Sequence, residues 1–431
     1  MEKEGEAGMP MTEHVSSPET EYNQAPAERF RRGMLLLQRI GGPDFDGPIN
    51  RLSRLSKDMA RFTVEYPYGD VLSRPGLDLR LRQICTISAL LAQASLQPQL
   101  KFHMEGLLNV GGTPDDLVEL LFLSTAMLGF PIAIDSIGIV RDIFTERGLA
   151  FAPKEPDDGD GTDRYRRGLG TFRDLMGMDP SAFCAAFASI SPELAQWSLE
   201  FVFGDVMARH GLTNEDKHLA IISMLGATGN RSELMRLHLR AAVAGGVTLP
   251  TLAEAIMQLS VYAGFPAALN GFALLGAVVE DPPDQHPTTA DLHPTPVAED
   301  TGSESRRLRR NRGLTALAAT SSASGEAVVH SFDDVAPEIG GLIVEFCYGD
   351  IFHRSGIDAK TRELTACAAL AARGAATDVT PLRVHIRAAI KAGARKDEIV
   401  ETLLNMLPYS GYPAIRQAMI LAAEEFAAIQ P

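Results

Sequence analysis

Three histidine–glutamate pairs are the residues of this sequence best suited to chemistry. In each pair the histidine lies eight residues before a glycine, and the glutamate lies eight residues after it. A carboxylate beside an imidazole fixes the tautomer of the ring and raises its pKa toward neutral pH, so the pair can transfer protons. A structural hydrogen bond inside a helical hairpin is the alternative, and repetition alone does not decide between the two. The pairs are His103 with Glu119, His238 with Glu254, and His385 with Glu401.

A cationic side chain recurs at a third position, four residues after a predicted helix cap. Arg82 and Arg362 could hold a substrate carboxylate through two parallel hydrogen bonds, whereas Lys217 offers only a point charge. The alternative is a solvated charge in the first turn of a helix. We therefore add these three cations to the candidate site residues.

Phenols and a second set of arginines complete the candidates. Tyr262 and Tyr409 each precede a Gly-aromatic-Pro sequence by two residues, and each would line a pocket or fill the core. An arginine also follows an aspartate by four residues in each copy, beside glycines that indicate a tight turn, so a structural ion pair or turn bond is expected there. These arginines, kept as candidate substrate-binding residues, are Arg74, Arg209 and Arg354, and the aspartates are Asp70, Asp205 and Asp350.

All these positions follow a threefold internal repeat. The step from the first to the second copy is 135 residues, and the third copy carries a two-residue insertion before its histidine. Each copy also begins with an Arg-aromatic-Arg-Arg-Gly motif at residues 29–33 and 164–168, with a looser version at 309–313. The predicted divisions are a disordered leader (1–27), a first repeat (28–153), a linker (154–162), a second repeat (163–280), an acidic, Pro-rich linker (281–305) and a third repeat (306–431).

The apolar residues of each unit recur with a helical period and without a convincing strand period, which predicts an all-α fold. In the first unit the helices are expected over 79–94, 100–110 and 117–128, with N-caps at Asp78 and Thr113. Glycines suited to a left-handed cap then mark helical hairpins. At 1.5 Å per residue, each histidine and glutamate would stand about 12 Å from the bend, level across the hairpin. These glycines are Gly111, Gly246 and Gly393.

Composition excludes several classes of function. Acidic residues outnumber basic ones by 55 to 40, so the chain lacks the basic footprint of a nucleic-acid-binding protein. No apolar run is long enough to span a bilayer and the leader has no apolar signal segment, which predicts a cytoplasmic protein without a membrane partner. The four cysteines lack metal-ligand spacing, so free buried thiols and no metal site are expected.

The motifs together resemble the carboxymuconolactone decarboxylase family, specifically its γ-carboxymuconolactone decarboxylases. The resemblance covers nearly the whole chain apart from the leader and linkers. It rests on the run from Gly69 to Asp78, Arg82, the helix of His103, Gly111, Glu119, Gly129-Phe130-Pro131 and Tyr262-Ala263-Gly264-Phe265-Pro266. The alkylhydroperoxidase-like branch uses a C-x-x-C pair before the histidine, which is absent here, so dithiol chemistry is not expected.

The resemblance implies an all-helical fold that assembles as trimers or hexamers, with pockets near the unit interfaces and no metal or organic cofactor. Three tethered copies would then form an intrachain pseudo-trimer, and a homodimer would give a pseudo-hexamer. The implied activity is cofactor-independent decarboxylation of a conjugated carboxylic acid or lactone through an enolate-type intermediate. In this mechanism an arginine engages substrate charge, a histidine moves the proton and a glutamate orients the histidine.

Copy three retains Arg362, His385, Glu401 and Tyr409 together, so we expect the competent site there first and in copy one second. Isomerisation, ring opening or cyclisation of a conjugated acid or ketone in a natural-product pathway would use the same proton transfers. A non-catalytic ligand-binding or scaffold protein is the alternative outside enzymes.

Overall fold

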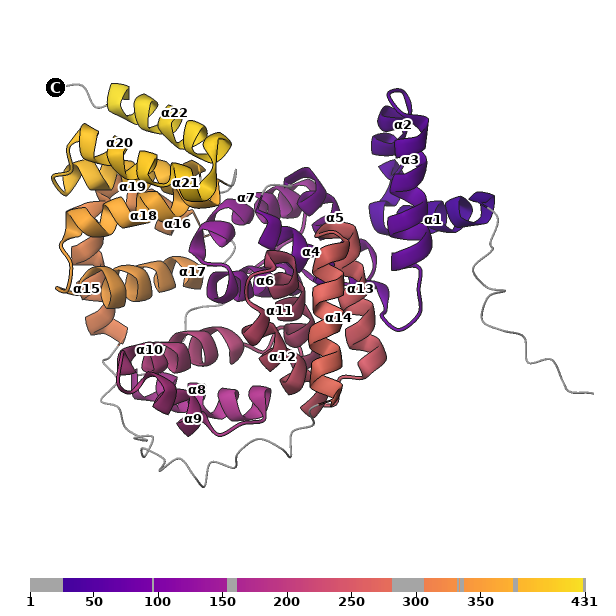
Figure 1. Ribbon diagram of the computed structural model, residues 1–431, viewed down its shortest axis with the longest axis horizontal. Coiled ribbons are helices and arrows are strands. Elements are labelled where there is room, and N and C mark those ends of the chain that lie inside the picture. Colours follow the sequence, from indigo (N-terminus) through magenta and orange to yellow (C-terminus); the bar gives the residue numbers. More distant parts are fainter. Residues whose placement is uncertain are drawn as a thin grey trace, which may run out of the picture.

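The computed structural model describes residues 26–94, 97–152, 161–280, 306–331, 333, 337–374 and 379–428 (Figure 1). Throughout these residues the chain is helical and has no strand, which confirms the predicted all-α class. The predicted leader up to residue 25, and residues 154–160 and 281–305 of the two linkers, lie outside the described residues. None of the described helices is both long and apolar enough to traverse a bilayer.

Each copy contains a π-helix that is followed by further α-helices. Copy one consists of α1 (Pro26–Gly41), the 3-10 helix η2 (Gly42–Asp44), α2 (Gly47–Ser53), α3 (Lys57–Val64), the π-helix η3 (Glu65–Leu72), α4 (Leu79–Gln93), α5 (Gln97–Asn109), α6 (Pro114–Met127) and α7 (Phe130–Glu146). Copy two consists of α8 (Gly161–Met176), α9 (Pro180–Phe187), α10 (Pro192–Trp197), the π-helix η4 (Ser198–Met207), α11 (Asn214–Thr228), α12 (Ser232–Ala244), α13 (Leu249–Tyr262) and α14 (Phe265–Glu280).

Copy three repeats this order, with one hairpin helix interrupted. It consists of α15 (Arg306–Thr320), α16 (Ser322–His330), α17 (Pro337–Leu342), the π-helix η6 (Ile343–Phe352), α18 (Ala359–Arg373), α19 (Val379–Lys391), α20 (Lys396–Asn405), α21 (Leu407–Ser410) and α22 (Tyr412–Ala428). In sequence register, α4, α11 and α18 are equivalent, as are α6, α13 and α20.

The helix ends follow the predicted local chemistry. The Asp78 side chain accepts a hydrogen bond from the Leu81 amide at 2.8 Å, and Thr113 forms a capping box at the start of α6. The three hairpin glycines have φ values of +99°, +90° and +93°, a region that side chains with a Cβ avoid. The predicted hairpins of Gly111, Gly246 and Gly393 are therefore confirmed.

The glycine that ends each Arg-aromatic-Arg-Arg-Gly motif allows the first helix of a copy to pack on its π-helix. A Cβ on Gly168 would lie 1.9 Å from the Leu199 carbonyl oxygen, and a Cβ on Gly313 would lie 2.0 Å from that of Val344. Both distances are far below van der Waals contact. Only glycine fits at this crossing, which explains its recurrence in the motif.

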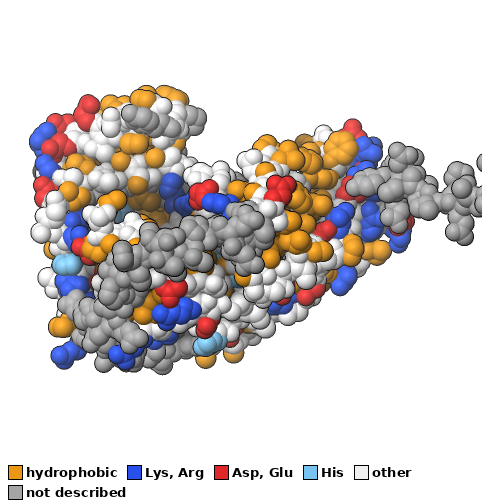
Figure 2. Space-filling view, turned by 60° about the horizontal axis from the view of Figure 1, so that its bottom comes forward, with side chains coloured by type: hydrophobic (Ala, Val, Ile, Leu, Met, Phe, Trp, Pro, Cys, Tyr) orange, Lys and Arg blue, Asp and Glu red, His pale blue; other side chains and the backbone are white. Residues whose placement is uncertain are grey.

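Copies one and two are packed together, whereas much of copy three has a core of its own. Helices α4 and α11 lie side by side at the centre of the molecule (Figure 1), and their side chains share one hydrophobic core with α6, α13 and η6. Helices α18 to α22 enclose a separate core around Cys367 and Ile386. Figure 2 shows this part at the left of the view, with a hollow between it and the lobe on the right. Hydrophobic side chains gather on the right-hand lobe.

Copy three is joined to copy two through the π-helices rather than through α18. The rings of Phe201 in η4 and Phe346 in η6 stack at 4.3 Å between centroids. Copies one and two instead meet through α4 and α11. Copy three also contacts copy one, since Arg373 of α18 donates to the Leu128 carbonyl at 3.1 Å. The three copies meet through different faces, and the predicted intrachain pseudo-trimer stays a prediction.

The cysteines are all free thiols, as predicted. Cys85 and Cys367 are buried, whereas Cys184 and Cys347 are partly exposed, so the expectation of burial holds for two of the four. Among the described residues, no group of three or more His, Cys, Asp or Glu side chains is arranged to hold a metal ion.

Candidate active site

The first candidate site is composite, because copy two supplies the acid for the arginines of copy one. Arg82 is fully buried, and its Nη2 donates to Glu254 Oε2 at 3.0 Å while its Nη1 donates to Gln258 Oε1 at 3.3 Å. Arg74 Nε donates to Glu254 Oε1 at 2.9 Å. Glu254 thus neutralises two cations of the neighbouring copy, so Arg82 is already held by protein groups rather than offered to a substrate.

The same exchange runs in the other direction. Arg209 of copy two donates through Nε to Glu119 Oε2 of copy one at 2.9 Å, and its guanidinium carbon lies 3.6 Å from the centre of the Phe122 ring. Lys217 donates through Nζ to the carbonyls of Met207 at 2.8 Å and Arg209 at 2.6 Å. Burial lowers the pKa of Lys217. Copies one and two therefore form a reciprocal pair, and Lys217 holds a loop rather than a substrate.

The predicted His103–Glu119 pair is wrong. His103 Nδ1 lies 2.8 Å from Gln83 Oε1 in its own copy, and its Nε2 lies 3.4 Å from the Tyr262 hydroxyl of copy two. His103 is 4% exposed, and burial lowers its pKa to about 3, so the ring stays neutral at neutral pH. The histidine and the glutamate stand level along the hairpin but contact different neighbours.

The His238–Glu254 pair is wrong for the same reason. His238 Nδ1 lies 3.4 Å from Nδ1 of His218, whose Nε2 lies 3.1 Å from the Leu175 carbonyl oxygen. Burial lowers the pKa of His238 to about 3 and that of His218 to about 4. These rings form a neutral, buried contact with no carboxylate.

Copy three does contain a histidine–carboxylate pair, but its acid is Glu363 rather than Glu401. His385 Nδ1 lies 2.7 Å from Glu363 Oε2, and Glu363 is fully buried beneath the partly exposed imidazole. Glu401 on α20 is exposed, so the predicted His385–Glu401 pair is wrong. The other carboxylate oxygen of Glu363 has no hydrogen-bond partner among the described residues.

The cations of copy three have partners that differ from those of Arg74 and Arg82. Arg362 donates through Nη2 to the Arg354 carbonyl at 2.5 Å and forms no ion pair with a described residue. Arg354 lies 3.6 Å from Glu193 and 5.1 Å from the centre of the Trp197 ring, both in copy two. The side chain of Tyr409 lies outside the described residues. Of the residues predicted to act together in copy three, Arg362, His385 and Glu401 make no hydrogen bond or ion pair with one another among the described residues.

A cavity of about 630 Å³ lies beside Arg354, between copies two and three. Arg309 and Arg312 of α15 line it together with Trp197 and Gln196 of α10. Phe352, two residues before Arg354, lies 6.1 Å from the His385 ring between ring centres. Three arginines and two acids, Glu200 and Asp350, therefore line the cavity. Its residue Arg354 is two residues along the chain from Phe352, the ring that neighbours His385.

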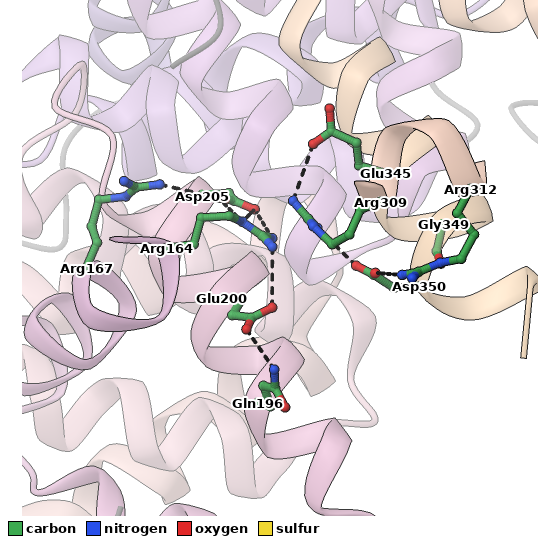
Figure 3. A network of polar contacts seen from close by, with 10 residues as sticks. All are labelled: Arg164, Arg167, Gln196, Glu200, Asp205, Arg309, Arg312, Glu345, Gly349 and Asp350. Carbon is green, nitrogen blue, oxygen red and sulfur yellow. Dashed lines mark hydrogen bonds and ion pairs between the residues drawn. The ribbon is translucent and has the colours of Figure 1, made fainter. Parts of the chain in front are cut away.

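The aspartates have partners other than the arginines four residues later, so the ion-pair form of that prediction is wrong. The turn bond, its alternative, is present, because the backbone amides of these arginines donate to the carbonyls of Val71, Val206 and Ile351. Figure 3 shows Arg164 between Asp205 and Glu200, and Arg309 between Asp350 and Glu345. The partner is thus the first arginine of the Arg-aromatic-Arg-Arg-Gly motif, 41 residues before the aspartate in every copy. The three pairs are Arg29–Asp70, Arg164–Asp205 and Arg309–Asp350.

The histidine partners were missed in the sequence, although a signal was present. Gln83, His218 and Glu363 directly follow the three cations, at a polar position inside a helix whose neighbouring residues are mostly buried. A polar residue repeated at a buried position needs a hydrogen-bond partner. The histidine on the next helix is the group that provides one.

These observations define a class of protein, an all-helical tandem repeat. Acidic side chains of copies one and two form ion pairs with arginines of the other copy, and copy three holds a histidine–carboxylate pair. The family model described as the carboxymuconolactone decarboxylase family matches the chain three times, at residues 57–142, 192–277 and 337–424. The chain belongs to this family.

Three similar proteins are known by name. A 4-carboxymuconolactone decarboxylase of Acinetobacter baylyi is 27% identical over 124 residues, which cover 28% of this chain and 92% of that protein. An uncharacterized 15.0 kDa protein of Paracoccus denitrificans is 35% identical over 99 residues, 23% of this chain and 73% of that protein. A solved chain from Burkholderia xenovorans, named as a γ-carboxymuconolactone decarboxylase subunit, is 22% identical with a TM-score of 0.37, covering 60% of this chain and 98% of that one.

Proposed function

We propose that the protein catalyses cofactor-independent decarboxylation of a conjugated carboxylic acid or lactone, and that copy three carries the reaction. The observation on which this proposal depends is the 2.7 Å contact between His385 Nδ1 and Glu363 Oε2. Membership in the family supports the reaction type. A small-molecule acid as partner and a cytoplasmic location belong to the same proposal.

His385 would move the proton. With Nδ1–H donated to the Glu363 carboxylate, Nε2 carries the lone pair, and Nε2 has no hydrogen-bond partner among the described residues. The buried carboxylate fixes this tautomer and stabilises the imidazolium when the ring takes up a proton. In the decarboxylation step, the bond to the carboxylate carbon breaks, CO₂ leaves and the electron pair flows through the conjugated system onto the carbonyl oxygen. Protonated His385 then donates a proton to carbon, and water reprotonates the imidazole.

Arg354 would anchor the substrate. Its guanidinium lines the cavity together with Arg309 and Arg312, and the carboxylates of Glu200 and Asp350 line the same cavity. A planar guanidinium binds a carboxylate through two parallel hydrogen bonds. Arg362 holds the Arg354 carbonyl and so positions this loop. The substrate contact that we predicted for Arg362 is therefore assigned to its neighbour Arg354.

Copies one and two favour a scaffold role. Their histidines are buried and neutral, and their cations are held by acids or carbonyls of the protein. Among the described residues of these copies, the buried rings of His103, His218 and His238 make no hydrogen bond with a carboxylate. This observation supports a non-catalytic function for these two copies, within a protein whose third copy is catalytic.

The test of this proposal replaces the acid of the His385–Glu363 pair by the amide that copy one has at the equivalent position. Glu363→Gln gives copy three the residue that copy one has at Gln83. We expect turnover of γ-carboxymuconolactone, or of the best substrate in a panel of conjugated acids and lactones, to fall by about 100-fold with an altered pH profile. Glu424→Gln, which removes an exposed acid of the same copy, serves as the control.

Measuring CO₂ release and deuterium uptake from D₂O on the same samples separates the related reactions. CO₂ with deuterium incorporation supports decarboxylation, whereas deuterium uptake without CO₂ would replace it by isomerisation. Full activity of Glu363→Gln would contradict the assignment of the His385–Glu363 pair.

A further inference from the structure

Another cavity, of about 520 Å³, lies in copy one between α1 and the segment that joins η3 to α4. Figure 1 shows α1 at the right-hand edge of the molecule, on the opposite side from copy three. This cavity is therefore separate from the one beside Arg354, although equivalent elements of the two copies line them. Its apolar lining consists of Leu35, Leu36, Leu72, Leu77 and Leu79.

Four arginines and two acids also line this cavity. Both acids already have partners within copy one. Glu28 accepts a hydrogen bond from Arg31 at 2.9 Å, and Asp78 accepts one from the backbone at the start of α4. Because the arginines outnumber the acids, the cavity has an excess of positive charge and would attract an anion. The arginines are Arg31, Arg32, Arg39 and Arg74.

Two of these arginines have donors that no described residue occupies. Arg39 on α1 is exposed and forms no hydrogen bond or ion pair with a described residue. Arg74 binds Glu254 through Nε alone, at 2.9 and 3.2 Å, so its two Nη groups are unbonded among the described residues. Arg39 and Arg74 come from the two elements that enclose the cavity. A carboxylate there can accept hydrogen bonds from both.

The residues that make this cavity apolar and basic occur in copy one alone. Copies two and three have small or polar residues at the positions of Leu35 and Leu36, and no cation at the position of Arg39. Leu35 is 52% exposed, so it adds little to the core of copy one. The shared framework therefore does not require these side chains. Their equivalents are Gly170, Thr171 and Asp174 in copy two, and Thr315, Ala316 and Ala319 in copy three.

We propose that this cavity binds an amphiphilic monocarboxylate, with its hydrocarbon chain along the leucines and its carboxylate at Arg39 and Arg74. Each methylene buried against the leucines strengthens binding. The guanidinium groups select the anionic head, because a cationic head in the same place would meet like charges. The inference does not rest on the proposed function, since none of these residues belongs to copy three.

The experiment is isothermal titration calorimetry of the full chain with decanoate, at concentrations below those at which decanoate forms micelles. We expect one decanoate to bind per chain. Acetate lacks the hydrocarbon chain, and decyltrimethylammonium has the same chain with the opposite charge. Each should bind at least about tenfold more weakly than decanoate.

Two variants introduce residues of copy three into the cavity. Arg39→Ala removes a donor to the carboxylate and Leu35→Thr removes apolar surface, so each should weaken decanoate binding by about tenfold. Arg51→Ala and Leu55→Thr are the matched controls, because both side chains are exposed and lie outside the cavity. The two controls should bind decanoate as the unaltered protein does.

Absence of decanoate binding would overturn the proposal, as would Arg39→Ala and Leu35→Thr variants that bind decanoate as tightly as the unaltered protein. Equal affinity for decanoate and decyltrimethylammonium would overturn the assigned contact with the arginines. Co-sedimentation with phosphatidylglycerol vesicles distinguishes a free acid from a lipid surface. Vesicle binding that both variants lose, without binding of free decanoate, would overturn the free acid as the ligand.

Discussion

Copies one and two differ from copy three in what their equivalent polar residues contact. In the paired copies the glutamate of α6 or α13 is buried against cations of the other copy, and the histidine beneath is sealed and neutral. In copy three the glutamate is in solvent, Arg362 forms no ion pair with a described residue, and the histidine contacts a carboxylate of its own copy. The same helical framework thus places equivalent polar residues in different surroundings.

The difference teaches that a repeated site residue has no fixed role. Arg82 and Arg362 occupy equivalent positions, yet one is completely enclosed and the other is half-buried. The burial of this arginine depends on whether a neighbouring copy covers its helix. Equivalent residues of the three copies can therefore differ in burial and in partners.

The largest expected effect is on stability, from removing one acid of the paired copies. Glu254→Ala leaves Arg82 buried without its carboxylate, so the free energy of unfolding should fall by about 3–5 kcal/mol. The equivalent Glu401→Ala lies in solvent and should change stability by less than about 0.5 kcal/mol. Urea unfolding at concentrations too low for self-association measures both. Equal effects of the two variants would remove the contrast between the regions.

A smaller effect is expected at the helix crossing that all copies share. Gly313→Ala forces a Cβ against the Val344 carbonyl oxygen and should destabilise copy three by about 1–3 kcal/mol. Gly276→Ala in α14 meets nothing within 4 Å, so it should be neutral or slightly stabilising. Thermal unfolding of the two variants compares them directly. A tolerated alanine at 313 would show that the crossing is less tight than described.

The smallest expected effect is a pH dependence confined to the paired copies. Burial lowers the pKa of His103 from 6.5 to about 3, so the unfolded chain takes up the proton first as pH falls. The stability that the neutral His103 ring contributes is therefore present above pH 6.5 and is lost as the pH falls from 6.5 to about 3. Between neutral pH and about pH 5.5, the free energy of unfolding should fall by about 1.4 kcal/mol more in the unaltered protein than in the His103→Gln variant. Identical pH profiles would contradict the sealed state of this ring.

Much of the fold could be predicted from local sequence. The three copies, the helices, the caps at Asp78 and Thr113 and the hairpin glycines follow from periodicity and from backbone chemistry within a few residues. The polar partners could not be predicted in the same way. A hairpin fixes how far His103 and Glu119 stand from the bend but not the direction in which each side chain points.

The ion pairs between a glutamate of one copy and arginines of another could not be predicted from local sequence, because they depend on which helices pack together. Nothing in the neighbourhood of Glu254 shows that its cations come from residues 74 and 82 of another unit. The Arg–Asp pairs were more accessible, since a constant spacing of 41 residues recurs in all three copies. Glu363 was overlooked because only one of the three copies has an acid at that position.

Turnover of three single variants tests the central claim most directly. His385→Gln, His103→Gln and His238→Gln are assayed on the same substrate under the same conditions. The account predicts that His385→Gln lowers turnover by about 100-fold to 10,000-fold, whereas the other two stay within about threefold of the unaltered protein. Loss of activity in His103→Gln or His238→Gln, with His385→Gln fully active, would contradict it.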